Sequence, residues 1–443
     1  MKAILVIDAT VNRIQKGFKK KHIKKFSATF LARIITAASS ILIIALIGQI
    51  LGAEGVGQFA ILQSILIGFS VISRYGMDNT LLKKVSATDN SEEHHKYLFW
   101  AVKRCAIASI LFALLIYVNR GPISKLTNQD EIRNLLVIVS LSLLPFSLNS
   151  ILSGYYKGKK RPALATLIDS GGTYSMALII LAPTTIFKEI NIESILLTIL
   201  FCSLVILIIT VYSLHKETPF KFKFTQLTPP EKHLLEKDSL NYLIISLNQL
   251  TQTSLFIIIP AIYLNGHDVG ILKSAERISQ LIAFSLIVVN TVIPPYFSRA
   301  FTEKDYGKVK DAFLVSCALP LAISTPIIGA CIILPELILG LFGNEFKQGS
   351  DVLLIITFGQ IINIATGAST YFLCMINKEN IVRNITIISS LVGVICLNLL
   401  TSNFGIYGAA ATYSITILIT NLSAFVYALI YLNKISIHKN DIS

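Results

Sequence analysis

The segment IITAASSILIIALIGQILGAEGVGQFAILQSILIGFSVIS, residues 34–73, decides the fold, because Glu54 is its only charged residue. A helix needs about 20 mostly apolar residues to cross the hydrocarbon core of a bilayer while satisfying its own backbone. The segment is long enough for two such helices joined by a short turn near Glu54. It therefore predicts two successive membrane spans.

The rest of the chain repeats this pattern. Of 443 residues, 53% are hydrophobic and only 14% are charged, whereas soluble domains carry about 25% charged residues. We expect an all-α integral membrane protein with about twelve transmembrane helices, at residues 28–50, 57–76, 97–118, 135–156, 163–187, 192–213, 240–264, 270–295, 311–334, 351–372, 380–401 and 406–432.

The basic residues indicate the orientation of these helices. Of the 39 Lys and Arg residues, 27 lie in segments on the same side as the two termini, 5 lie in the opposite gaps and 7 lie inside the expected helices. Cytoplasmic loops collect Lys and Arg, so we expect a multi-pass protein of the bacterial inner (cytoplasmic) membrane with both termini in the cytoplasm. The same rule accounts for most of the net charge of +14, so nucleic acid is not an expected partner.

The expected helices fall into two six-helix lobes around a central cavity. We expect a basic cytoplasmic N-terminal segment (1–27), a first lobe (28–213), a cytoplasmic linker (214–239), a second lobe (240–432) and a cytoplasmic tail (433–443).

Two segments at the outer turns of the lobes resemble each other. LGAEGVGQFAILQS (51–64) aligns with LNGHDVGILKSAER (264–277), and Leu, Val and Gly recur at matching positions. Six helices in each half predict parallel repeats related by an axis along the membrane normal, and transporters built in this way bind their substrate where the lobes meet.

Charged residues inside the expected helices are the first candidate site residues. They are costly at membrane depth and usually face a cavity or a partner. The basic candidates for the lining of the cavity are Arg33, Lys103, Arg104, Lys273 and Arg277. The acidic ones, Asp169 and Glu276, are candidates for ion coupling or for an ion pair. Lys273, Glu276 and Arg277 share one helix face, where an internal ion pair that holds helices together is the alternative to a cavity lining.

Amide side chains form the second set of candidates. Asn248, Gln252, Gln360 and Asn363 lie inside expected helices. An amide both donates and accepts hydrogen bonds, as sugar hydroxyls require. Hydrogen bonding between helices is the alternative explanation of these residues.

The sequence carries no signature of catalysis. It has no HExxH, P-loop or GxSxG motif and no cysteine or histidine spacing typical of a metal site. We therefore expect no cofactor and no metal. The longest outer gap, 119–134, is short for an enzyme that works outside the membrane, which disfavours a membrane-embedded glycan polymerase.

Several segments together carry a resemblance to a known family. They are LIGQILGAEGVGQFAILQS (46–64), SRYGMDNTLLKKVS (73–86), GILKSAERISQL (270–281) and FGNEFKQGSDVLLIITFGQIINIATGASTYFLCMINKEN (342–380). With these segments the chain resembles the Wzx-type O-antigen and capsule-unit flippases of the multidrug/oligosaccharidyl-lipid/polysaccharide exporter superfamily.

The resemblance implies a function. The cargo would be an undecaprenyl-diphosphate-linked oligosaccharide, moved from the cytoplasmic to the periplasmic leaflet by alternating access, and Arg33, Lys103, Arg104, Lys273 and Arg277 could line the cavity. It implies a transporter rather than an enzyme, and we expect a monomer in the lipid bilayer. A glycan polymerase or chain-length regulator stays open as a further partner, and a multidrug exporter of the same superfamily is the alternative function.

Overall fold

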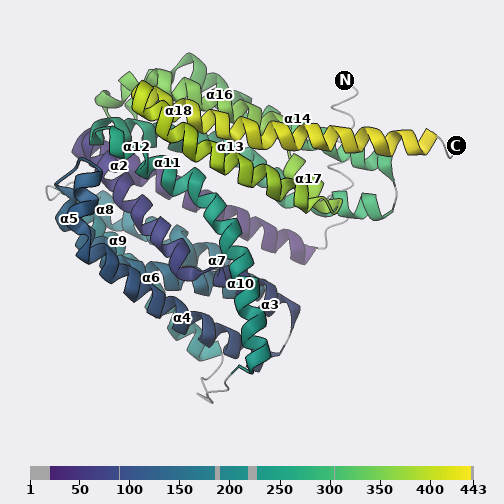
Figure 1. Cartoon of the computed structure of the whole chain (residues 1–443), viewed down its shortest axis with the longest axis horizontal. Coiled ribbons are helices and arrows are strands. Elements are labelled where there is room, and N and C mark those ends of the chain that lie inside the picture. Colours follow the sequence, from purple (N-terminus) through teal and green to yellow (C-terminus); the bar gives the residue numbers. More distant parts are fainter. Residues whose placement is uncertain (1–19, 89, 185–189, 218–226, 304, 441–443) are drawn as a thin grey trace. The chain divides into compact units, whose positions relative to one another are not determined.

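The computed structural model describes residues 20–88, 90–184, 190–217, 227–303 and 305–440, and every element in this part of the chain is a helix (Figure 1). The elements are α2 (Lys20–Arg74), α3 (Met77–Ala87), α4 (Ser91–Val118), α5 (Arg120–Leu126), α6 (Ile132–Gly158), α7 (Pro162–Thr166), η1 (Leu167–Gly171), α8 (Gly172–Thr184), α9 (Ile192–Glu217), α10 (Pro229–Leu250), η2 (Thr251–Leu255), α11 (Phe256–Ile258), α12 (Pro260–Tyr263), α13 (Gly266–Thr302), α14 (Tyr306–Ile333), α15 (Pro335–Gly340), η3 (Asn344–Gly349), α16 (Ser350–Ala365), α17 (Ser369–Met375) and α18 (Glu379–Asn440).

The helix lengths confirm the expected membrane fold. Within the described ranges, nine helical stretches are long and apolar enough to cross a membrane. Two of them, Ser27–Arg74 with 48 residues and Glu379–Asn433 with 55 residues, are long enough to cross twice. Counting these two twice and adding α13, which has 37 residues, gives the twelve crossings that the sequence predicts.

Glycines take the place of two of the expected outer turns. Gly52 has a φ of 68° and interrupts α2, and Gly405 has a φ of 57° and interrupts α18. Only glycine adopts this left-handed region without a steric penalty. In each of these two helices the chain therefore bends at a single glycine between two membrane crossings. The sequence indicated a short loop at both places.

The chain divides into two compact units. The first unit is Lys24–Gly270, and the second unit consists of the described residues before Lys24 and from Ile271 onward. The boundary lies later in the chain than the predicted linker 214–239, because α10 to α12 group with the helices before them. The predicted lobes, 28–213 and 240–432, therefore do not coincide with these compact units, and the division into lobes stays a prediction.

In the first unit, α6 is the central helix. Helices α4 and α9 both pack against it, and α8 packs against α9 (Figure 1). Helix α3 also lies directly on α6, because Gly154 has no side chain there: a Cβ atom would lie 2.3 Å from the backbone oxygen of Asp78. Tyr155 and Tyr156 follow this glycine and are fully buried between α3, α4 and α6.

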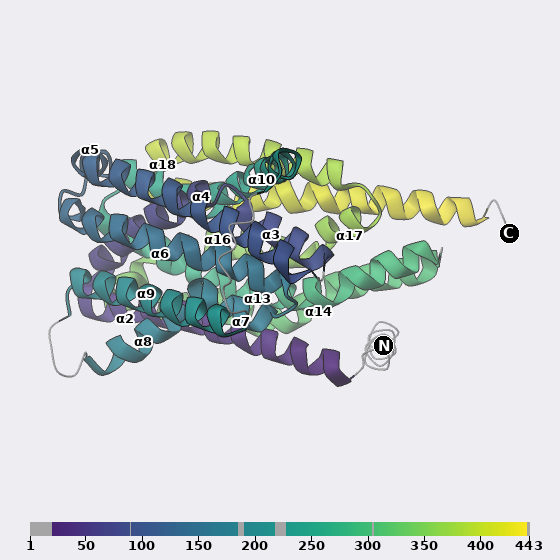
Figure 2. The ribbon, with the colours of Figure 1, turned by 90° about the horizontal axis from the view of Figure 1, so that it is seen from below.

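In the second unit, α18 packs against α16 and α17, and α14 packs against α16 (Figure 2). Its core is aromatic. Phe372 on α17 meets Phe297 of α13 and Phe313 of α14 edge to face, each with ring centroids 5.3 Å apart. Such pairs add to the stability gained from apolar burial alone, so three helices of this unit are fixed by one aromatic residue.

Ion pairs attach α10 to α3 within the first unit. Asp238 of α10 lies 3.2 Å from Lys83 and 3.0 Å from Lys84 of α3. One residue further along α10, the Ser239 hydroxyl lies 3.0 Å from that of Thr80. Gly76, just before α3, allows the close approach, since a Cβ there would lie 2.4 Å from the Ser239 carbonyl oxygen. These contacts explain why α10 groups with the helices that precede it.

The part of the second resembling segment that belongs to the first unit, residues 264–270, lies against the first segment there. A Cβ at Gly57 would lie 1.8 Å from the Gly266 carbonyl oxygen, and a Cβ at Gly270 would lie 1.9 Å from the Ala53 carbonyl oxygen. In the alignment of 51–64 with 264–277, Gly57 corresponds to Gly270 and Ala53 corresponds to Gly266. The two contacts therefore join equivalent pairs of positions in the alignment.

We expect Gly57→Ala to destabilise the protein by about 1–3 kcal/mol, as overpacking of a tight contact usually does. The melting temperature of the purified protein in detergent measures the effect. Gly329→Ala in α14 is the matched control, since no described atom lies within 4 Å of its Cβ position, and it should leave the melting temperature unchanged or raise it. Equal behaviour of the two variants would contradict the close approach of the segments.

Candidate functional site

Lys273 and Glu276 on α13 form a buried ion pair. Their charged atoms, Nζ and Oε2, are 2.8 Å apart, and the two side chains are only 7% and 5% exposed. They lie three residues apart and therefore share one helix face, as the sequence indicates. A buried charge is tolerated when it is paired, so each of these two residues stabilises the other inside the second unit.

Arg277 and Gln280 continue this cluster along the same face. The Arg277 guanidinium donates from Nη1 to Gln280 Oε1 at 3.0 Å, while Gln280 Nε2 donates to Glu276 Oε1. Arg277 is half-buried, unlike the ion pair beside it. The three charged groups of this face sum to one positive charge, so the cluster suits an anionic ligand group.

The predicted amides of α16 meet each other and a tyrosine of α18. Gln360 donates from Nε2 to the Tyr413 hydroxyl at 3.1 Å, and Asn363 donates to Gln360 Oε1 at 2.8 Å. The Tyr413 side chain also lies close to Ser279 and Glu276 of α13. Tyr413 therefore joins the amides of α16 to the charged residues of α13.

We call these seven residues the α13 network: Lys273, Glu276, Arg277, Gln280, Gln360, Asn363 and Tyr413. Five of them were predicted from the sequence. Gln280 and Tyr413 were not, although the spacing of four residues between Glu276 and Gln280 was a signal that could have identified the glutamine.

Three other predicted basic residues lie in the first unit. Arg33 on α2 and Lys103 on α4 are exposed. The Arg104 guanidinium lies 2.6 Å from the Glu236 carboxylate of α10 and 5.3 Å from the centre of the Trp100 ring. The two neighbouring cations of α4 thus differ in environment, and Arg104 takes part in the attachment of α10.

The remaining predicted residues have separate environments. Asp169 in η1 accepts a hydrogen bond from the Ser150 hydroxyl at 2.9 Å and lies 3.7 Å from Lys157 Nζ, so its partner is a lysine of α6. Gln252 is half-buried in η2. Asn248 belongs to α10, but its side chain lies outside the described residues. In the described part of the chain, no group of three His, Cys, Asp or Glu residues is placed to hold a metal ion.

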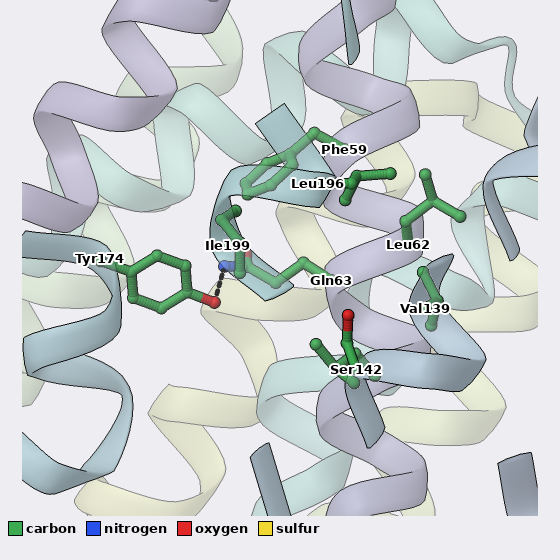
Figure 3. A pocket seen from close by; sticks show the side chains of 9 residues that line it. Phe59, Leu62, Gln63, Val139, Ser142, Tyr174, Leu196 and Ile199 are labelled. Atoms are coloured by element: carbon green, nitrogen blue, oxygen red, sulfur yellow. Dashed lines mark hydrogen bonds between the residues drawn. The ribbon is translucent and has the colours of Figure 1, made fainter. Parts of the chain in front are cut away.

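The first unit has a small pocket beside Gln63, a residue that aligns with the charged Glu276 of the second unit. It is lined mainly by apolar side chains, and Gln63 of α2 donates to the Tyr174 hydroxyl of α8 at 2.6 Å beside it (Figure 3). In the alignment of the repeats, Gln63 and Ser64 correspond to Glu276 and Arg277. The aligned positions of the first half are therefore neutral, and the charged pair belongs to the second half.

The sequence comparisons give a family. The family described as "Polysaccharide biosynthesis protein" matches residues 22–301, which is more than half of the chain. The chain belongs to the polysaccharide biosynthesis protein family. The MatE family also matches, over residues 245–400. A comparison with curated protein sequences gave no match.

Solved structures confirm the fold of the multidrug/oligosaccharidyl-lipid/polysaccharide (MOP) superfamily. An inward-facing multidrug resistance MATE transporter has a TM-score of 0.73 at 14% identity, covering 94% of this chain and 98% of the other. The lipid II flippase MurJ in an inward closed conformation has 0.72 at 19% identity, covering 94% and 90%. An outward-facing MATE transporter has 0.60 at 16% identity, covering 93% of each chain. The chain is thus a multi-pass membrane protein that shares the fold of these transporters, as the sequence predicts.

The attachment of α10 leads to a prediction. Asp238→Lys would place a third cation beside Lys83 and Lys84. Loss of an exposed ion pair costs about 1 kcal/mol of stability, and breaking a buried one costs about 3–5 kcal/mol. We expect the loss of stability in this variant to lie between these two values. Adding Lys84→Asp should restore part of the lost melting temperature, because the swapped charges attract again.

The exposed pair of Arg299 and Glu303, 2.8 Å apart, supplies the control. Glu303→Lys should change the melting temperature little, since exposed ion pairs contribute little to stability. No recovery in the Asp238→Lys, Lys84→Asp double variant would show that these charges do not hold α10 on α3.

Proposed function

We propose that the protein is a flippase for undecaprenyl-diphosphate-linked oligosaccharides. Its cargo would be a repeat unit of O-antigen or capsule type, moved from the cytoplasmic to the outer leaflet of the bacterial inner membrane by alternating access. Membership of the polysaccharide biosynthesis family supports the class of cargo. The fold shared with a lipid II flippase supports a transport step on a lipid-linked substrate.

The α13 network is the observation that carries this proposal. It offers a half-buried guanidinium, which pairs with phosphate oxygens. It also offers the half-buried amide of Asn363, which can exchange hydrogen bonds with sugar hydroxyls and is held in place by the buried Gln360. A lipid-linked glycan presents both kinds of group, while its polyprenyl tail can stay in the hydrocarbon of the bilayer.

The chemistry of transport follows from these groups. A diphosphate and a chain of hydroxyls lose hydration when they leave water, and burial without new hydrogen bonds is costly. Arg277 and Asn363 would replace part of that hydration on the way across. The protein would need no covalent step, which agrees with a transporter rather than an enzyme.

A multidrug exporter of the same superfamily is the second candidate, favoured by the MatE match over residues 245–400. Such an exporter needs a carboxylate to attract a cationic drug. Within the α13 network the only carboxylate is Glu276, and it is paired with Lys273. A cation would therefore have to displace the ammonium of Lys273, which favours an anionic cargo.

Cells that lack the gene should lose long surface glycan and accumulate single diphosphate-linked repeat units on the cytoplasmic leaflet. Glycan gels and analysis of the lipid-linked intermediates measure both effects. Normal glycan together with raised sensitivity to cationic drugs would favour the exporter instead. The same analysis identifies the sugars of the cargo.

Arg277→Ala should abolish complementation of the deletion at unchanged protein level, because it removes the guanidinium that would meet the diphosphate. Arg299→Ala is the matched control: the Arg299 side chain is 80% exposed and pairs with Glu303, just beyond the end of its helix, so its loss should leave glycan display normal. Unchanged glycan in the Arg277→Ala strain would reject the proposed site.

A further inference from the structure

Gln280 bonds two charged neighbours through a single amide group. Its oxygen accepts from the Arg277 guanidinium at 3.0 Å, and its nitrogen donates to the carboxylate of Glu276. Among side chains of this length, only glutamine accepts from a cation with one end and donates to an anion with the other; glutamate cannot donate when ionised, and leucine can do neither. The residue type therefore fits its two neighbours.

The two bonds fix the amide because Glu276 is itself fixed. Its other carboxylate oxygen lies 2.8 Å from Lys273 Nζ, and both side chains of that pair are less than a tenth exposed. Contacts thus run from the buried Lys273 through Glu276 and Gln280 to the half-buried Arg277. Four residues of one helix form a continuous series of polar contacts.

We propose that Gln280 is a positioning residue of the cargo site: it holds the Arg277 guanidinium in one direction, so that this group meets the diphosphate of the cargo already oriented. This inference rests on the proposed function. An arginine side chain otherwise loses rotational freedom when it binds a ligand, and that loss weakens binding. Orientation in advance removes part of the cost.

Tyr413 of α18 lies near the same cluster on a second helix. It accepts a hydrogen bond from Gln360 at 3.1 Å and lies close to Glu276. The carboxylate that anchors Gln280 therefore lies within electrostatic range of a tyrosine of α18. Gln280 consequently has a fixed partner on one side and the ligand-binding cation on the other.

The test measures binding of undecaprenyl diphosphate, without sugars, to the full-length purified protein in lipid nanodiscs. Gln280→Leu removes both hydrogen bonds at similar volume and should raise the apparent Kd about three- to tenfold, the range that one ordered side chain costs. If the leucine variant does not fold, Gln280→Met keeps the length of the side chain and is expected to give the same increase.

A double-mutant cycle distinguishes positioning from a general structural role. If Gln280 acts through Arg277, the change Gln280→Leu should have no further effect on Kd once Arg277→Ala is present. The same factor of increase in both backgrounds would overturn the inference, as would an unchanged Kd in Gln280→Leu alone.

Gln63→Leu is the matched control. It also removes a buried amide, one that is hydrogen-bonded to Tyr174 in the first unit, and it should lower the melting temperature without changing Kd. An equal increase of Kd in this control would attribute the effect to general loosening and reject positioning. Absence of binding by the unmodified protein would reject the proposed cargo and this inference together, whereas an additive cycle rejects the inference alone.

Discussion

A charge placed among apolar helices must find a partner, and the buried pair of Lys273 and Glu276 meets this constraint within one helix. Removal of either residue would leave the other charge buried and uncompensated, which typically costs about 3–5 kcal/mol. The position of Gln280 depends on the pair, since its amide donates to the same carboxylate. The direction of Arg277 depends in turn on Gln280. The proposed site is therefore built outward from this buried ion pair of α13.

The two halves of the chain use the same framework for different purposes. Where the second half has Glu276 and Arg277, the aligned positions of the first half have Gln63 and Ser64, and Gln63 bonds to Tyr174 beside a small, mainly apolar pocket. A neutral amide satisfied by a phenol costs little to bury and attracts no ion. At these aligned positions, the charged side chains thus belong to the second repeat and neutral ones to the first.

The membrane crossings could be predicted because the bilayer imposes a one-dimensional rule on length and polarity. The pair of Lys273 and Glu276 followed from helical spacing. The attachment of α10 could not be predicted, since it depends on Asp238 meeting Lys84 across more than a hundred residues of chain. Tyr413 was missed because an aromatic residue in an apolar span gives no pattern; only the fold brings it to Gln360.

The glycine contacts between α2 and α13 bear on how such a chain could arise. Gly57 approaches Gly266, and Gly270 approaches Ala53, so each contact is the image of the other. An interface with this property is self-complementary: two identical half-length chains could form it across a two-fold axis. Gene duplication and fusion would turn that homodimer into one polypeptide without disturbing its packing. After fusion, both contacts still require small residues at their equivalent positions, whereas positions further along each helix are free to diverge.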